Sequence, residues 1–168
     1  MNKPILCVDF DGVVHSYITP WHRADIIPDP PVPGALRWLW NATEWFSVVI
    51  YSSRSKSEAG RNAMRLWMCG HSLDEFGPDH PMTMPYELYP ITFAHEKPAA
   101  FLTIDDRAIC FDGDWSALDP TELLNFKPWN KRPPVQRPTI EELEKMLQEP
   151  DTKVKINPDG SVKVEKTS

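Results

Sequence analysis

The chain has 168 residues, which suits one domain with a buried core. Hydrophobic residues make up 41% and charged residues 25%, and the net charge of −6 argues against a nucleic-acid groove spread over the surface. The three cysteines show no metal-ligand or CxxC spacing, which argues against a disulfide framework or a structural zinc site. The chain shows neither a signal-peptide pattern nor a run of about 18 apolar residues, so we expect a cytoplasmic protein that does not contact membranes.

Apolar runs and amphipathic stretches alternate along the first 104 residues. The runs predict buried strands at 4–8, 46–51 and 101–104, and helical spacing predicts helices at 34–45 and 56–69, the second ended by Gly70. Short strands are also expected at 91–94 and 108–111, with Cys7 and Cys110 as small core residues. Residues 15–33 carry five prolines and indicate a loop. This order predicts an α/β fold with a Rossmann-like parallel sheet flanked by helices.

The C-terminal third has a different composition. Residues 126–138 contain four prolines and indicate a linker, and Thr139 with Glu142 forms a capping-box pattern that predicts a helix to about Gln148. The sequence Asn-Pro-Asp-Gly near the end indicates a hairpin or a flexible tail. We therefore expect residues 1–125 to form the main domain, 126–150 a linker and a helix packing on it, and 151–168 the hairpin or tail.

Polar residues follow three of the predicted strands, where parallel strands place binding sites. Asp9 and Asp11 follow the first strand and point to the same side of an extended chain, so their charges repel unless a cation lies between them. Mg²⁺ with oxygen ligands is the natural partner of such a pair. The alternative is that Asp11-Gly12 is a hairpin turn.

The second and third strands end in further reactive groups. Ser52, Ser53 and Arg54 lie between a strand and a helix and offer a cradle for phosphate, although an ordinary helix cap is the alternative. Asp105 and Asp106 end the third strand, and their charges need a metal or a salt bridge to a base such as Arg107. Together the three strand ends favour a phosphate site with a divalent metal.

These segments in this order resemble the haloacid-dehalogenase-like (HAD) hydrolase superfamily. The resemblance covers about residues 4–115, through Asp9-Phe-Asp11-Gly12, Ser52 and the pair Asp105-Asp106. It implies that Asp9 is the nucleophile and a Mg²⁺ ligand, and that Asp11 is the general acid and base and binds the metal through its carbonyl. It further implies that Ser52 holds the phosphoryl group and that Asp105, with Asp106, completes the metal site.

The resemblance also requires a cation that balances the charge of the phosphate. Lys97 is the obvious candidate, but one extended strand over 98–105 would place it about 25 Å from the active edge. Either this segment bends back, or Arg54, Lys56 or Arg107 supplies the charge. Both possibilities stay open from the sequence alone.

Short intervals between the motifs leave no room for a large cap domain, so an open site is expected. The leading interpretation is a Mg²⁺-dependent phosphatase that hydrolyses phosphomonoesters of small molecules or nucleotides through an aspartyl-phosphate. A nucleotide or nucleic-acid 3′-phosphate substrate is an alternative, motivated by Trp21-His22-Arg23 in the Pro-rich loop. A phosphate- or metal-binding module without turnover is the other alternative.

Overall fold

The fold was analysed in a computed structural model of the chain. It describes residues 2–85, 88–110, 113–115, 118–133, 139, 152–156 and 162–166. The chain divides into two compact units, residues 1–131 and 132–168. Each unit is described by itself below.

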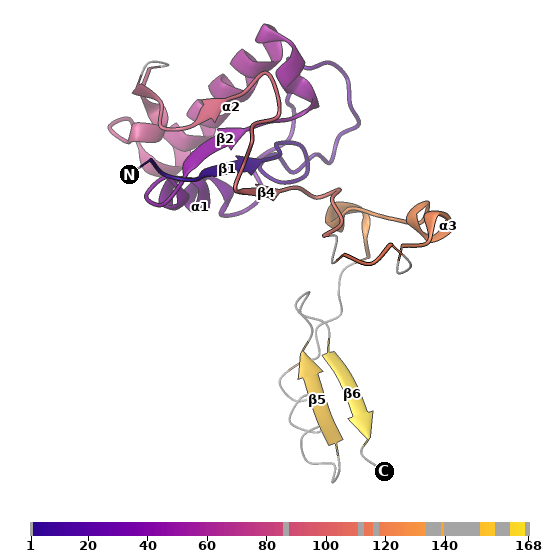
Figure 1. The fold of residues 1–168 in the computed structure, drawn as a ribbon. Helices are drawn as coiled ribbons and strands as arrows, with labels where there is room; N and C mark the ends of the chain where they lie inside the picture. The colour runs from indigo at the N-terminus through magenta and orange to yellow at the C-terminus, as the bar shows by residue number, and fades with distance from the viewer. Residues whose placement is uncertain are drawn as a thin grey trace. The chain divides into compact units, whose positions relative to one another are not determined.

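A four-stranded parallel sheet forms the centre of the first unit (Figure 1). Its strands are β1 (Ile5–Val8), β2 (Ser47–Ile50), β3 (Thr92–Phe93) and β4 (Leu102–Ile104), in the order β3-β2-β1-β4. Val8 is level with Ile50 on one side and with Ile104 on the other. The residues that follow β1, β2 and β4 therefore meet at one edge of the sheet, as the sequence predicts for a parallel α/β fold.

Two helices cross between these strands. α1 (Ala35–Ala42) connects β1 to β2, and α2 (Glu58–Phe76) follows β2 after the short 3₁₀ helix η1 (Ser53–Lys56). The Ser57 side chain caps α2 by accepting a 3.0 Å hydrogen bond from the backbone N–H of Gly60. The expectation that Gly70 ends this helix is wrong, because Gly70 is exposed in its interior and the helix continues to Gly77, whose φ is 86°.

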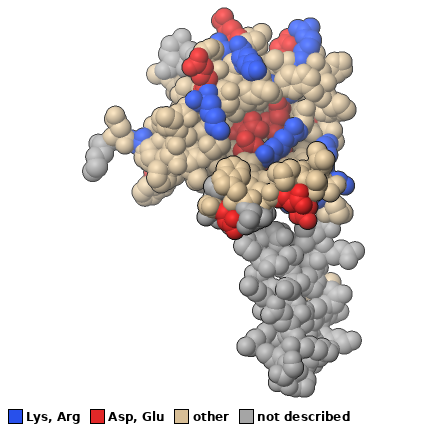
Figure 2. Space-filling view, turned by 45° about the vertical axis from the view of Figure 1, so that its right-hand side comes forward, with Lys and Arg blue, Asp and Glu red and all other residues tan. Residues whose placement is uncertain are grey.

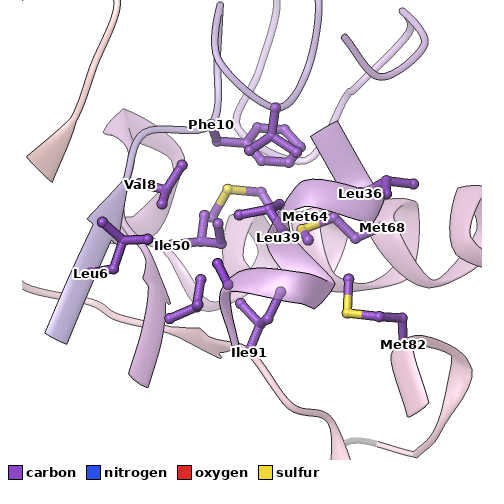
Figure 3. Close-up of a cluster of buried hydrophobic side chains, with 13 residues drawn as sticks. Leu6, Val8, Phe10, Leu36, Leu39, Ile50, Met64, Met68, Met82 and Ile91 are labelled. Carbon is purple, nitrogen blue, oxygen red and sulfur yellow. The ribbon is translucent and has the colours of Figure 1, made fainter. Parts of the chain in front are cut away.

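The hydrophobic core lies between the sheet and these two helices (Figure 3). Leu6 and Val8 of β1 point the same way as Val48 and Ile50 of β2, as alternate residues of paired strands do. Their partners across the core are the fully buried side chains of α1 and α2, namely Leu36, Leu39, Met64 and Met68. Cys7 is buried, as predicted, but it lies on the opposite face of the sheet and lines the cleft described below.

The last strand of the sheet differs from its prediction. The run 101–104 was expected to be buried, yet Phe101 is 75% exposed and Leu102 is 51% exposed, because β4 forms the edge of the sheet. Residues 94–101, which connect β3 to β4, contain no helix that would cover it. Cys110 is exposed rather than a core residue, and residues 108–110 form no strand; Phe111 lies outside the described residues.

The remaining described elements are short. η2 (Pro81–Thr83) follows α2, and α3 (Pro120–Leu123) and η5 (Trp129–Lys131) complete the first unit, so residues 126–131 belong to it. In the second unit, β5 (Thr152–Ile156) pairs antiparallel with β6 (Val162–Lys166), as a hairpin requires. The predicted Asn-Pro-Asp-Gly turn and the helix after Thr139 lie outside the described residues. None of the described helices is long and apolar enough to span a bilayer.

The core predicts a contrast between two neighbouring positions of α2. Met64 is fully buried, so Met64→Ala should lower the free energy of unfolding by about 2–5 kcal/mol through lost burial and a cavity. Leu66 is 60% exposed on the same helix, and Leu66→Ala should change it by less than about 1 kcal/mol. Urea unfolding of both variants measures the difference, and equal losses would contradict this assignment of the core.

Candidate active site

Backbone pairing brings three chain segments together at the carboxyl edge of the sheet. Asp9 follows β1 directly, and its backbone N–H donates a 2.9 Å hydrogen bond to the carbonyl of Ile104 in β4. On the other side, the N–H of Tyr51 donates a 3.1 Å hydrogen bond to the carbonyl of Val8. The side chains that follow β1, β2 and β4 are therefore neighbours.

Three carboxylates gather at this edge. Asp9, Asp105 and Asp106 each place a carboxylate oxygen within 4.8 Å of the others. Burial, with a smaller contribution from the negative charges of Asp105, Asp11 and Asp106, raises the pKa of Asp9 to about 7, although a backbone hydrogen bond from Phe10 opposes the shift. Burial also raises the pKa of Asp106, and the charges of Asp105 and Asp11 add to this effect while Arg107 opposes it. Negative charge at the cluster therefore outweighs the positive charge of Arg107 beside it.

The carboxylate of Asp106 has an unusual environment. Its side chain is only 1% exposed, yet neither of its oxygens has a hydrogen-bond partner among the described residues, and the nearest cation, Nε of Arg107, is 3.8 Å away. Gly12 makes room for it, because a Cβ at that position would collide with the Asp106 carboxylate. Gly12 also has a φ of 89°, which favours glycine.

These three residues fit a divalent cation. Buried carboxylate oxygens without donors are costly unless a positive charge replaces the water they have lost. Carboxylates are also the ligands that Mg²⁺ prefers, usually with several waters completing its coordination. The donor set and the two unsatisfied oxygens of Asp106 could therefore hold a divalent cation, with Asp9, Asp105 and Asp106 as its protein ligands.

Asp11 points its carboxylate to a different set of partners. Nε of Arg54 donates to both of its oxygens, at 3.0 and 2.9 Å, and Nδ1 of His15 lies 2.9 Å from one of them. The hydroxyl of Ser52 donates a longer hydrogen bond of 3.4 Å to the other oxygen. These contacts fix the orientation of Asp11, and its carboxylate is not one of the three in the acidic cluster.

Arg54 is buried and does not line the cleft described below. It is 1% exposed, and its Nη1 donates to the carbonyls of Arg23, Ala24 and Ile26 at 2.9–3.0 Å. Trp21 lies against its guanidinium at 4.5 Å. Arg54 thus connects the Pro-rich loop to Asp11, which differs from the phosphate-binding role expected from the sequence.

A cleft of about 290 Å³ opens above the sheet edge. The residues that line it are Cys7, Asp9, Asp11, Tyr17, Tyr51, Ser52, Ser53, Lys97, Thr103, Asp105 and Arg107. Figure 2 shows one face of the protein, on which acidic side chains gather between basic ones. The cleft therefore contains the predicted residues Ser52, Ser53 and Lys97 beside Asp9.

Lys97 reaches the cleft because the chain bends between β3 and β4. Ala94 donates to the carbonyl of Ile50 at the carboxyl edge, and Lys97 comes three residues later. The chain then turns at Pro98, whose carbonyl accepts from the N–H of Ala100, and β4 spans only Leu102–Ile104. Of the two possibilities left open by the sequence, the segment bends back. Arg107 also lines the cleft, whereas Arg54 and Lys56 do not.

Several residues at this site were missed from the sequence. His15 and Tyr17 lie in the loop after Gly12, and Trp129 and Asn130 come from a segment predicted to be a linker. The indole N–H of Trp129 donates a 2.6 Å hydrogen bond to the carbonyl of Gly12, and Asn130 donates to the carbonyl of Ser16 at 3.2 Å. Only the capacity of these side chains for hydrogen bonds was visible in the sequence, and nothing indicated their partners more than 110 residues away.

Comparison of the chain with known protein families, with characterised proteins and with solved structures finds no match.

The raised pKa of Asp9 predicts a pH-dependent effect on stability. Because the native pKa is about 7 and the ordinary value is 3.8, the native state holds a proton that the unfolded chain has lost, so stability falls as the pH rises from 4 to 7. Asp9→Asn has no carboxyl group that titrates at this position, so this loss of stability with rising pH should be absent from the variant. Without divalent cations, its stability relative to the wild type should increase by about 2–4 kcal/mol between pH 4 and pH 8.

Urea unfolding in EDTA at both pH values measures this difference. Asp79→Asn, which changes an exposed carboxylate in the same way, serves as the control and should show no such increase. A difference between Asp9→Asn and wild type that is the same at pH 4 and pH 8 would contradict the raised pKa of Asp9.

The buried pair of Arg54 and Asp11 predicts a second effect. Arg54→Met removes the cation paired with the Asp11 carboxylate and the donor to three loop carbonyls, so the free energy of unfolding should fall by about 3–5 kcal/mol. Arg23→Met also removes an Arg–Asp pair, but that pair is on the surface, and its loss should have little effect. Thermal and urea unfolding compare the two variants, and similar losses would show that burial does not strengthen the Arg54 pair.

Proposed function

We propose that this protein is a Mg²⁺-dependent phosphomonoester hydrolase of the HAD-like type, which acts through an aspartyl-phosphate on Asp9. The observation that carries the proposal is the acidic cluster of Asp9, Asp105 and Asp106 beside a cleft that also contains Ser52 and Lys97. Separate motifs of the sequence supply these groups from three strand ends. A phosphoryl group in this cleft meets a nucleophile, a hydroxyl and a cation together.

The first chemical step forms a bond between a carboxylate oxygen of Asp9 and phosphorus. The bond from phosphorus to the ester oxygen breaks, and the departing oxygen takes a proton from the Asp11 carboxyl. In the second step, water attacks phosphorus and gives a proton to Asp11, while the bond from phosphorus to Asp9 breaks. The products are an alcohol and inorganic phosphate, and both aspartates return to their initial states.

The other residues bind and orient the phosphoryl group. The Lys97 ammonium balances negative charge on its oxygens, and the hydroxyls of Ser52 and Ser53 donate hydrogen bonds to them. Mg²⁺ held by the acidic cluster would neutralise the charges of its carboxylates and stabilise the charge that develops on the phosphoryl oxygens. With that cation bound, Asp9 would be ionised and able to act as a nucleophile.

Asp11 needs freedom to exchange its proton with the substrate. Its carboxylate lines the cleft, but its oxygens contact Arg54, His15 and Ser52. For Asp11 to carry a proton to the ester oxygen, one of its oxygens has to release the donor from Arg54 or His15 when the substrate binds. In this proposal, Arg54 and His15 are positioning residues that keep the Asp11 carboxyl at the cleft wall.

The structure gives no specific support to the proposed preference for nucleotides or 3′-phosphate ends through Trp21-His22-Arg23. Trp21 lies against Arg54, and Arg23 pairs with Asp25 at 2.6 Å, and none of the three residues lines the cleft. A binding module without turnover also remains without a specific observation in its favour. Simple phosphomonoesters are therefore the first substrates to test.

Turnover of p-nitrophenyl phosphate with Mg²⁺ tests the proposal. Asp9→Asn should lower kcat by at least about 10³-fold, because it removes the nucleophile. EDTA should abolish the wild-type activity and Mg²⁺ should restore it, while the surface variant Asp79→Asn should retain it. Acid quenching should trap a protein-bound phosphate in the wild type alone. Full activity of Asp9→Asn would refute the mechanism.

A further inference from the structure

Tyr17 has a backbone conformation that its residue type does not favour. Its φ is +49°, and it is the only described non-glycine residue with a positive φ. Left-handed backbone costs an ordinary L-residue roughly 1–2 kcal/mol, whereas glycine adopts it freely and asparagine adopts it more easily. If the backbone turn were the only requirement at this position, glycine or asparagine would adopt it with less strain than tyrosine. The presence of tyrosine therefore indicates that its ring is used.

Contacts on several sides hold Tyr17 in this conformation. Its ring packs edge-on against the ring of His15 at 5.9 Å, and the guanidinium of Arg107 lies over it at 5.8 Å. Asn130 donates to the backbone carbonyl of Tyr17 at 3.5 Å and to that of Ser16 at 3.2 Å. Strained residues that are fixed by their surroundings in this way are concentrated at functional sites.

The ring of Tyr17 belongs to the wall of the cleft that contains Asp9. Tyr51, which directly precedes Ser52, lines the same cleft, and so does Arg107. Both tyrosines are half-buried, so each keeps part of its surface accessible. A cleft of about 290 Å³ is at the lower end of the range for ligand pockets, so it holds a phosphoryl group and the part of the substrate next to it.

We propose that Tyr17, Tyr51 and Arg107 form a subsite for an aromatic ring in the alcohol part of the substrate, next to the ester oxygen. The inference rests on the proposed phosphatase function and names its substrate class, phosphate esters of alcohols that carry a flat ring. Aromatic rings pack favourably on one another, and a guanidinium attracts the face of a ring. A saturated ring of equal size gains neither interaction.

Two pairs of matched ligands test the subsite. Benzyl phosphate and cyclohexylmethyl phosphate have leaving groups of similar size and both lose an alkoxide, but only the first is aromatic. Their kcat/KM values with Mg²⁺ should differ by about 3- to 10-fold in favour of benzyl phosphate. The corresponding phosphonates cannot be hydrolysed, and their Kd values, measured by calorimetry, should show the same preference without turnover.

Variants assign the preference to Tyr17. Tyr17→Gly removes the ring and suits the positive φ, so the protein should stay folded in thermal unfolding while the ratio of the two kcat/KM values falls toward one. Tyr17→Phe retains the ring and should retain the ratio. Trp21→Leu removes an aromatic side chain of the same loop outside the cleft, and it should also leave the ratio unchanged.

The outcomes separate the subsite from the chemistry. Hydrolysis of both esters at equal rates would overturn the subsite and leave the phosphatase function intact. Preferential binding of benzylphosphonate without hydrolysis of either ester would support the subsite and refute the phosphatase. If Tyr17→Gly keeps the full preference, the assignment to Tyr17 is wrong, and if neither ligand binds or reacts, both proposals fail.

Discussion

Repulsion among the carboxylates at the ends of β1 and β4 governs the organisation of this site. The backbone bond from Asp9 to Ile104 holds these two strand ends together, so the backbones of Asp9, Asp105 and Asp106 stay close to one another. Water cannot relieve the repulsion fully, because Asp106 is almost completely buried. A fold that keeps such a cluster loses stability through this repulsion, and a bound cation would relieve it.

Arg54 offsets the negative charge of Asp11, the fourth carboxylate near this edge of the sheet. It pairs with Asp11 and so opposes the negative charge that this fourth carboxylate adds beside the cluster. Its other nitrogen binds three carbonyls of a loop that contains too many prolines to satisfy them by regular structure. One buried guanidinium therefore fixes both an essential side chain of the proposed mechanism and the loop that surrounds it, and the cations that line the cleft are Lys97 and Arg107.

The sequence was sufficient to predict the parallel sheet and most of the residues at its edge, because apolar runs followed by polar residues depend on local patterns alone. The sequence did not predict the features that depend on tertiary contacts. Arg54 precedes a helix like many phosphate ligands, and only the fold shows that Asp11 and the loop carbonyls enclose it. Gly70 resembles a helix end, but α2 continues through it. Met64 and Met68 pack the buried face of this helix against the core, whereas Gly70 lies on the face exposed to solvent. The local sequence around Tyr17 and Trp129 did not indicate that these residues lie at the site.

The short connection between β3 and β4 has two linked consequences. Because no helix intervenes in residues 94–101, the chain stays near the carboxyl edge after β3, and this places Lys97 in the cleft. The same absence leaves β4 without a covering layer, which is why Phe101 and Leu102 are exposed. A conventional crossover helix would bury these side chains, but it would also need a dozen or more residues and would change the path that brings Lys97 to Asp9. The exposure of the edge strand β4 and the position of Lys97 in the cleft thus both result from the short connection between β3 and β4.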